Sequence, residues 1–456
     1  MNRPFIKALT GIALLCFLLS PPCARAQDSD SSKQLERIAA LISENRIDEA
    51  ERQLTTILTR TPNNSLALNL LGTIRAKQQR LDDAEALFVR AVALDKEFLG
   101  AHMNLAYLYL IKGAPDKAIS ELREVLRLDP NNPDVSYKLA RLLLSQDRID
   151  ECIALIEDQK RSQPLPVPLI VLLGDAYAKH GVPSKAEENY LQTLNQQSTN
   201  ASALLGLAQL AQRKGDSNNA ALYLDRAKDS IKDSPDLLYS FARMALSSGL
   251  MNEALTALKR ATELKPSEAR YYYLYGLAWL QKADLQEAEL AFREFIKRQP
   301  DSSQGQMYLG YVLLKQKKIA EAREWLEKSA QKEAQTPEIY YYLGLIAQEQ
   351  ADYERAGELF EKAVRLEPAF AQAHIALGAT YLKLKDFPRA QTALETAVKL
   401  KPDDSKAHYN LALLFARLKD QQRAQDEMRL VEKLRSAEGP TDNKNEIIAP
   451  QTTGPK

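Results

Sequence analysis

Few side chains in this sequence could carry acid–base, nucleophilic or metal chemistry, because its 456 residues include only four histidines and three cysteines. Histidines can bind zinc or transfer protons near neutral pH. His102, His374 and His408, however, are separated from one another by multiples of 34 residues. A residue type that returns at such a long fixed interval usually fills the same packing position in successive structural units. We therefore expect these three histidines to be structural, and His180 to end a helix beside Gly181.

No other pattern in the sequence supplies a catalytic or metal site. There is no H-E-x-x-H pair, no glycine-rich phosphate loop, no nucleophile elbow and no cysteine pair with zinc spacing. Cys152 is the one cysteine after residue 26, so no intrachain disulfide is expected there, and its position predicts a buried, unreactive thiol. Carboxylates such as Glu121, Glu253 and Glu287 recur as they do on solvated helix faces. These observations predict a protein that is not an enzyme and has no cofactor or bound metal.

The N-terminal segment 1–26 has the features of a secretory signal peptide. It combines a basic start at Arg3 and Lys7, a largely apolar run over residues 8–19 and an A-R-A cleavage site at residues 24–26. A membrane-spanning helix would need a longer apolar run, of ~20 residues. We expect the segment to be cleaved, the protein to be exported to a bacterial periplasm or secreted, and the mature chain to have no membrane span.

The charge balance does not favour a nucleic-acid partner. The full chain has 61 basic and 60 acidic residues, and loss of the signal segment would remove three basic residues and no acidic one. The mature chain would then have 58 basic and 60 acidic residues, a formal net charge of −2. Because a nucleic-acid-binding surface needs a concentrated excess of positive charge, we expect no nucleic acid among the partners.

Alanine recurs along the chain at a fixed interval of 34 residues. The members of this series are Ala50, Ala84, Ala118, Ala186, Ala220, Ala254, Ala288, Ala322, Ala356, Ala390 and Ala424. Cys152, another small residue, fills the one gap in the series. An unbroken period of this length is typical of stacked-repeat proteins, in which one supersecondary unit recurs and packs on its neighbours. This architecture favours a binding function.

Each 34-residue unit contains two stripes of apolar residues with the 3.6-residue period of helices. Numbered within the unit, the first stripe occupies positions 4, 7, 8 and 11, and the second occupies positions 20, 24 and 27. Position 8 is glycine in six units. Because glycine costs a helix about 1 kcal/mol relative to alanine, its repeated use predicts a close backbone approach there. Short polar turns such as residues 112–115 separate the stripes, and proline at position 32 in seven units ends the second helix.

This pattern resembles the tetratricopeptide repeat, in which small, bulky and proline residues recur at these same positions of a 34-residue helical hairpin. The unit of residues 371–404 matches the family signature with His374, Leu377, Gly378, Tyr381, Ala390, Leu394, Ala397 and Pro402. The resemblance implies an all-α fold, an α-solenoid of twelve tandem helix-turn-helix repeats that forms a right-handed superhelix. It also implies a role in protein binding.

The expected domain organisation follows from this register. A signal peptide (1–26) and a short linker (27–30) precede the repeats, and a disordered tail (439–456) without periodicity follows them. The repeats are expected at residues 31–64, 65–98, 99–132, 133–166, 167–200, 201–234, 235–268, 269–302, 303–336, 337–370, 371–404 and 405–438. We expect the least regular junction at residues 164–168, where three prolines follow one another at alternate positions.

In tetratricopeptide arrays the first helices line a concave surface, and by this resemblance positions 5 and 9 face a groove with a basic edge at position 13. Positions 5 and 9 are an i,i+4 pair on one helix face. The candidate partner-binding residues at these positions are Tyr107, Tyr137, Arg141, Tyr239, Arg243, Tyr273, Tyr311, Tyr341 and Tyr409. Tyrosine offers a large contact area and a hydroxyl for hydrogen bonding, which suits recognition of a protein segment. The same rings could instead pack between neighbouring repeats.

One binding mode of the family is not expected. The clamp that binds a chaperone's C-terminal carboxylate needs lysine and asparagine at positions 5 and 9 of one unit and asparagine at position 6 of the next. Asn104 lies at position 6, but Asn69 and Thr73 occupy positions 5 and 9 before it.

The expected function is a non-catalytic protein–protein interaction scaffold or adaptor of the cell envelope, which binds a peptide or helix of a partner protein in the groove. Two alternatives stay open. One is an assembly or regulatory subunit of a secretion, pilus or polysaccharide-export complex. The other is a repeat subunit of an enzyme whose catalytic chain is separate.

Overall fold

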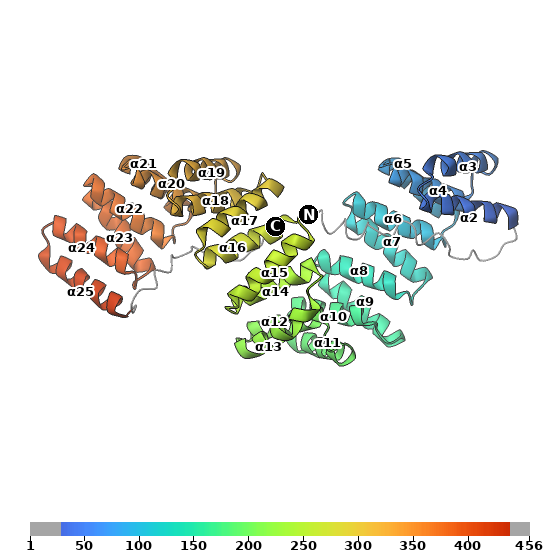
Figure 1. The fold of residues 1–456 in the computed structure, drawn as a ribbon, viewed down its shortest axis with the longest axis horizontal. Helices are drawn as coiled ribbons and strands as arrows, with labels where there is room; N and C mark the ends of the chain where they lie inside the picture. Colours follow the sequence, from blue (N-terminus) through green and yellow to red (C-terminus); the bar gives the residue numbers. More distant parts are fainter. Residues whose placement is uncertain (1–28, 438–456) are drawn as a thin grey trace. The chain divides into compact units, whose positions relative to one another are not determined.

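A computed structural model describes residues 29–437, and all regular secondary structure in this range is helical. The α-helices α2–α25 follow one another as antiparallel hairpins (Figure 1), which confirms the expected all-α repeat fold. The expected signal peptide and the expected C-terminal tail lie outside the described residues. Among the described helices, none combines the length and the apolar character that a membrane span requires.

The even-numbered helices are the first members of the hairpins, and the odd-numbered helices are the second members. The first helices are α2 (Ser29–Ser43), α4 (Ser65–Lys77), α6 (Leu99–Ile111), α8 (Pro133–Ser145), α10 (Val167–His180), α12 (Ala201–Arg213), α14 (Pro235–Ser247), α16 (Ala269–Gln281), α18 (Ser303–Lys315), α20 (Pro337–Glu349), α22 (Ala371–Leu384) and α24 (Ser405–Arg417). The second helices are α3 (Ile47–Arg60), α5 (Leu81–Leu94), α7 (Pro115–Leu128), α9 (Ile149–Ser162), α11 (Pro183–Gln196), α13 (Ser217–Ala227), α15 (Met251–Leu264), α17 (Leu285–Arg298), α19 (Ile319–Lys332), α21 (Tyr353–Leu366), α23 (Phe387–Leu400) and α25 (Gln421–Ala437).

The turn inside each hairpin uses a left-handed backbone residue at position 15 of the unit. Residues with positive φ recur every 34 residues from Asn45 to Lys419. Some are glycine, such as Gly113 with φ 72°, but others are not, such as Ala351 with φ 58°. A left-handed residue just after a helix lets the chain reverse direction while it satisfies the last carbonyl groups. At the other end of the unit, the second helices stop two residues before the proline at position 32, as the sequence predicts.

The chain divides into two compact bodies, which we call the N-terminal body and the C-terminal body. The division falls between Tyr223 and Leu224, inside α13. Here α13 has 11 residues instead of the usual 14 and continues as one 3₁₀ turn, Lys228–Ser230. The expectation that residues 164–168 form the least regular junction is wrong, because they join two full 14-residue helices, α9 and α10. A proline in the first turn of a helix removes an N–H group that has no partner there anyway, so it fits without distortion.

Consecutive first helices pack on each other within each body, as α18 does with α20 and α20 with α22. Within each body, the second helices contact the first helix of the next hairpin, as α17 does with α18. The alanine series fixes how closely the two helices of a hairpin approach. From Ala50 to Ala390 each alanine of the series is completely buried, and so is Cys152.

The glycines at position 8 make room for a side chain at position 24 of the same hairpin. A methyl group on Gly344 would lie 2.5 Å from Cε1 of Phe360, and one on Gly276 would lie 2.8 Å from Cε1 of Phe292. The expected close approach is therefore present, but its partner is an aromatic or aliphatic side chain and not the backbone alone. Hairpins with alanine at position 8 carry an aliphatic residue at position 24, such as Leu122 opposite Ala106.

This contact predicts that Gly344→Ala lowers stability. The new methyl group would overlap the ring of Phe360, which is fully buried and in ring contact with Tyr341, so the ring has no free space to enter. Overpacking of this kind costs about 1–3 kcal/mol, more than the ~1 kcal/mol that alanine gains in helix propensity. Urea unfolding followed by circular dichroism would measure the difference.

Two further variants in the same hairpin serve as controls. Gly357→Ala places its methyl group 3.8 Å from Tyr381, an ordinary contact, and should leave stability unchanged or raise it by up to ~1 kcal/mol. The double change Gly344→Ala with Phe360→Leu copies the alanine–leucine pair of other hairpins and should recover part of the loss. Equal destabilisation by both single glycine variants would contradict the contact.

Candidate functional site

The histidines that the sequence analysis singled out connect the two helices of a hairpin. His102 Nδ1 lies 2.7 Å from Glu121 Oε2, and His408 Nδ1 lies 2.6 Å from Glu427 Oε2. Both rings are 5% exposed, and the Nε2 atoms lie near backbone carbonyl oxygens. The hydrogen bond with Glu121 raises the pKa of His102. These contacts agree with the expected structural role, and they correct the expectation that Glu121 belongs to a solvated face.

His374 shares the packing slot of these histidines but lacks the carboxylate. Its Nε2 lies 3.0 Å from the carbonyl oxygen of Pro368, and its Nδ1 is buried without a hydrogen-bond partner. Ala393 occupies the position that glutamate holds in the other two hairpins. In the described range, no group of three or more histidine, cysteine or acidic side chains is placed to hold a metal ion.

The remaining chemical candidates are also structural. Cys152 is completely buried, and this burial raises the pKa of its thiol to about 12, so the thiolate needed for reactivity is scarce at neutral pH. His180 ends α10 beside Gly181, which is left-handed with φ 84°. The predicted burial of Cys152 and the predicted helix end at His180 are confirmed.

In the N-terminal body, the predicted groove residues differ in exposure. Tyr107 on α6 is 3% exposed, whereas Tyr137 and Arg141 on α8 are partly exposed. The side-chain amide of Asn104 donates a hydrogen bond to Asn69 Oδ1 over 2.9 Å, and both side chains are buried. The two asparagines thus bind each other within the packed hairpins.

Sequence reasoning missed a partly buried acid on α10. Asp175 Oδ1 accepts a hydrogen bond from the Tyr190 hydroxyl over 2.7 Å. The Tyr190 ring is enclosed by two glycines, since a methyl group on Gly174 or Gly206 would lie 2.6 or 2.4 Å from it. Burial raises the pKa of Asp175 from about 3.8 to about 6. The signal in the sequence was tyrosine at position 24, where the other hairpins have phenylalanine or an aliphatic residue.

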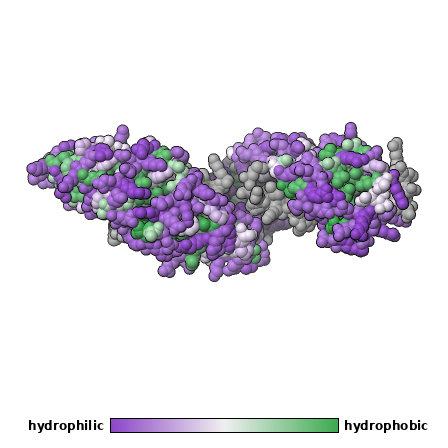
Figure 2. Space-filling model, turned by 90° about the horizontal axis from the view of Figure 1, so that it is seen from above, coloured by the Kyte–Doolittle hydropathy of each residue, from purple (hydrophilic) through white to green (hydrophobic). Residues whose placement is uncertain are grey.

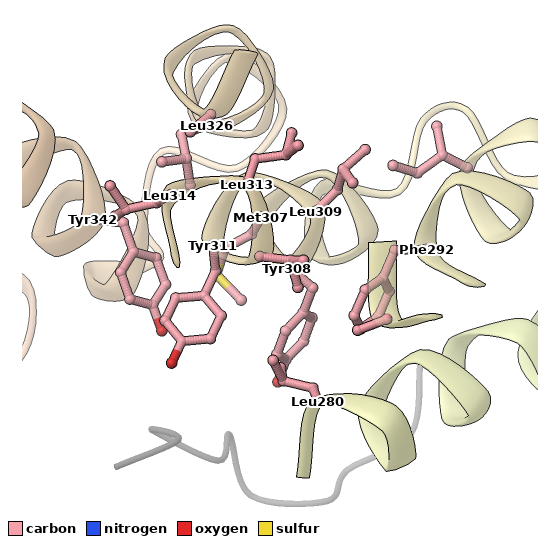
Figure 3. Packing of buried hydrophobic residues seen from close by; sticks show 14 of the residues in the cluster. Leu280, Phe292, Met307, Tyr308, Leu309, Tyr311, Leu313, Leu314, Leu326 and Tyr342 are labelled. Carbon is pink, nitrogen blue, oxygen red and sulfur yellow. The ribbon is translucent and has the colours of Figure 1, made fainter. Parts of the chain in front are cut away.

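In the C-terminal body, tyrosines gather on three consecutive first helices. We define the aromatic cluster as Tyr273 on α16, Tyr308 and Tyr311 on α18, and Tyr341 and Tyr342 on α20. The ring centroids of Tyr273 and Tyr308 are 5.8 Å apart, and those of Tyr311 and Tyr342 are 4.8 Å apart. Figure 3 shows the rings of Tyr308, Tyr311 and Tyr342 extending to the same side of α18 and α20. Burial raises the pKa of the Tyr311 hydroxyl to about 12.

The cluster shows which predicted tyrosines pack between repeats. Tyr273 is 7% exposed and its ring centroid lies 5.2 Å from that of Phe295. Tyr341 is partly exposed, and its ring lies 5.1 Å from that of Phe370. The position-5 rings of the cluster, Tyr273 and Tyr341, therefore pack against side chains of neighbouring helices, and Tyr311 at position 9 is also buried, with 5% exposure. The neighbouring tyrosines at position 6, Tyr308 and Tyr342, were not among the predicted residues.

The other predicted groove residues of the C-terminal body are more accessible to solvent. Tyr239 is partly exposed, with its ring 5.5 Å from that of Tyr271, and Arg243 is exposed. Tyr409 is 39% exposed on α24. It adjoins an apolar patch of α24 and α25 that includes Leu413 and Met428, 40% and 38% exposed. Figure 2 shows one face of the molecule, on which polar side chains predominate and apolar side chains form separate patches.

Two lysines on first helices of the C-terminal body influence each other electrostatically. Lys315 lies at the end of α18 and Lys406 lies at the start of α24. After burial, Lys406 is the main cause that lowers the pKa of Lys315. Both lysines therefore add positive charge to the row of first helices.

The chain was compared with protein-family models. Models described as the tetratricopeptide repeat match residues 35–97, 73–133, 109–171, 171–235, 239–295, 280–338 and 345–418. These ranges include nearly all of the described helices.

Among curated proteins, human protein O-mannosyl-transferase TMTC3 is 27% identical over 173 residues, which are 36% of this chain and 19% of that protein. DnaJ homolog subfamily C member 3 of Gallus gallus is 28% identical over 158 residues, 29% of this chain and 31% of that protein. Cellulose synthase operon protein C of Xanthomonas axonopodis pv. citri (strain 306) is 26% identical over 186 residues, 41% of this chain and 10% of that protein. The chain thus spans less than a third of each of these relatives.

Among solved structures, YrrB, described as a TPR protein with an unusual peptide-binding site, is 23% identical, with 40% of this chain and 95% of that chain covered and a TM-score of 0.34. For Pseudomonas aeruginosa pilF the identity is 18%, the coverage 45% and 93%, and the TM-score 0.40. At these identities and TM-scores the structures carry no conclusion about function.

Asp175 on α10 predicts a pH-dependent contribution to stability. Because burial raises the pKa of Asp175, the folded chain holds its proton more tightly than the unfolded chain does. The contribution is fully present below pH ~4 and is lost as the pH rises through about 6. Its size is at most about 3 kcal/mol. Asp175→Asn should therefore reduce the loss of unfolding free energy between pH 4 and pH 7, measured by urea unfolding.

Tyr190→Phe is the matched control for this prediction. The Tyr190 hydroxyl lowers the pKa of Asp175 by its hydrogen bond, so its removal should raise this pKa further and increase the pH dependence. If both variants keep the pH dependence of the wild-type protein, Asp175 is not its source.

Proposed function

Because this chain belongs to the tetratricopeptide repeat family, we propose that it is a non-catalytic scaffold that binds a segment of another protein. The observation that carries the proposal is that family matches follow one another along the described residues, which form helical hairpins throughout. Stacked repeats present an extended surface to which many units contribute. Repeats of this family typically bind proteins and are not catalytic.

We assign the binding surface to the first helices of the hairpins in the C-terminal body, beside the aromatic cluster. Tyr341 and Leu345 on α20 are partly exposed next to the buried rings, and Lys315 is exposed at the end of α18. Rings that are already packed lose little side-chain entropy when a ligand binds, which favours them as anchors for a partner. Lys315 at the end of α18 and Arg417 at the end of α24 occupy position 13, where the sequence suggests a basic edge.

Export belongs to this proposal, and its support is the pattern of the N-terminal segment 1–26. The alternative of an assembly subunit for polysaccharide export has support from the cellulose synthase operon relative, of which the match covers 10%. The alternative of a repeat subunit beside a separate catalytic chain has support from the O-mannosyl-transferase relative, of which the match covers 19%. All three versions use the same kind of surface and differ in the partner.

Photo-crosslinking in intact cells tests the binding surface. A photoreactive amino acid at Lys315 or Leu345 should capture one discrete partner, because both positions lie on the row of first helices. The controls are Leu290 and Glu324 on the second helices, with side chains that are 58% and 61% exposed. Equal capture from the controls would contradict the assignment.

Export has a separate test. Cell fractionation followed by mass spectrometry should find the chain outside the cytoplasm with Gln27 as its first residue. Replacing Ala26 by arginine should block cleavage and leave a longer, unprocessed chain. A cytoplasmic chain that retains residues 1–26 would contradict export without affecting the scaffold proposal.

A further inference from the structure

A hollow lies between α24 and α25, the last hairpin of the described range. It has a volume of about 390 Å³, and its lining includes Ala416 on α24 and Gln425 and Met428 on α25. Met428 is 38% exposed, whereas the position-24 residue of every other described hairpin is at most 3% exposed. Ala424 is partly exposed as well, although the other alanines of its series are completely buried. The last hairpin thus leaves open a surface that the other hairpins bury.

Another hairpin of the C-terminal body, α20–α21, shows what covers the equivalent surface. Gln348 stands at the position of Ala416, and its side chain donates a hydrogen bond to Thr380 Oγ1 over 2.7 Å. Gly357 stands at the position of Gln425, and a methyl group on it would lie 3.9 Å from Thr380 Cγ2. Thr380 belongs to α22, the first helix of the next hairpin. The hollow is therefore the place that a following first helix occupies elsewhere in the array.

A first helix covers the preceding hairpin with residues at positions 3, 7 and 10 of its unit. On α4 these are Ala67, Leu71 and Ile74, which belong to one apolar cluster with residues of α2 and α3. Residues at these intervals of four and three lie on one face of a helix. The equivalent residues of α24 are also apolar and at most 3% exposed: Ala407, Leu411 and Leu414. A helix with one small and two aliphatic residues at this spacing therefore fits such a surface.

A second copy of this chain does not supply such a helix. The stacking contact joins two different faces of a hairpin, so a copy would have to present its first helix, α2, to the hollow. On α2, positions 3 and 7 are Lys33 and Arg37, and both residues are exposed. Two cations at the places of alanine and leucine would lose hydration against an apolar surface, which is unfavourable.

The sequence after α25 does not supply it either. A helix between Pro440 and Pro450 would have at most nine residues, whereas α24 has 13. Ile447 and Ile448 are the aliphatic residues of this segment besides Ala449, and they are adjacent in sequence. Adjacent residues do not share a helix face, so the required spacing of four and three residues is missing.

We propose that the hollow binds an amphipathic helix of another protein, which stacks on α24 and α25 as a further first helix. The contact face of this helix has a small residue followed by aliphatic residues four and seven positions later. Arg429 and Glu432 also line the hollow, and they can pair with an acidic and a basic side chain beside that face. Such charges fix the orientation of a partner more than its affinity. The hollow shares no residue with the surface beside the aromatic cluster, so the proposed scaffold function is tested separately.

A helical peptide tests the hollow directly. The probe has the sequence of residues 404–418, a hydrocarbon bridge that holds it helical, and a fluorescent label. It should bind the purified full chain saturably, and Ala416→Glu should weaken this binding about tenfold, because the exposed alanine lines the hollow and glutamate would place a charge there. No saturable binding, or binding that Ala416→Glu does not weaken, would overturn the inference and leave the surface beside the aromatic cluster untouched.

A variant at the other end of the array is the matched control. Ala40→Glu adds the same charge at another exposed alanine, on α2, and should leave the affinity for the probe unchanged. Both variants should keep the urea midpoint of the wild-type chain, because both positions are exposed. Equal loss of affinity in the two variants would mean that net charge and not the hollow controls binding.

Two variants of the probe test the chemistry of the partner helix. Leu411→Glu in the peptide removes an aliphatic residue of the contact face and should abolish binding. Leu413→Glu makes the same change on another face, which is 40% exposed on α24 of the folded chain, and should leave binding unchanged. Equal losses from both changes would show that the hollow does not recognise the proposed face.

Two further measurements distinguish the partner helix from this chain itself. The sedimentation coefficient of the full chain should not depend on Ala416→Glu, and a dimer that this variant dissociates would place a second copy in the hollow. Ile447→Asp together with Ile448→Asp should leave the affinity for the probe unchanged. Tighter binding by that double variant would show that the residues after α25 compete for the hollow. Either result would overturn the inference.

Discussion

The structure depends on one volume constraint, which is the contact between the two helices of each hairpin. A large ring at position 24 is accommodated only where the opposite helix has no side chain, as with Phe360 against Gly344. The same rule operates between hairpins, since a methyl group on Gly305 would lie 2.3 Å from the ring of Phe295 in the preceding unit. Protein interiors are close-packed, so a large ring at position 24 requires a glycine opposite it. Ring and glycine together set the spacing of the array.

Most of this fold could be predicted from the sequence because the determinants are local and repeat. The alanine series, the position of the turns and the prolines at position 32 each act within one hairpin, and any error would recur visibly in every unit. The short helix α13 could not be predicted in this way. Ile231, which follows its 3₁₀ turn, is 2% exposed at a position where other units have a polar or charged residue. Its burial depends on tertiary contacts that the periodic pattern does not contain.

The candidate site was less predictable, for a geometric reason. Periodicity assigns a residue to a helix face, but a ring that braces the next helix and a ring that meets a partner leave the same face of the same helix. Tyr273 and Tyr409 occupy the same position in their units, yet one is 7% exposed and the other 39%. The difference arises from neighbours, such as Phe295, that belong to other helices. The position-6 tyrosines escaped notice for the same reason, since their environment is assembled from several hairpins.

Charge on this protein has to be considered locally, because the net charge of the chain is nearly zero. Many charged residues pair within one turn of a helix, as Arg46 does with Glu49 over 2.5 Å. Exposed pairs of this type contribute only ~0–1 kcal/mol to stability, but they leave little free charge on the surfaces they cover.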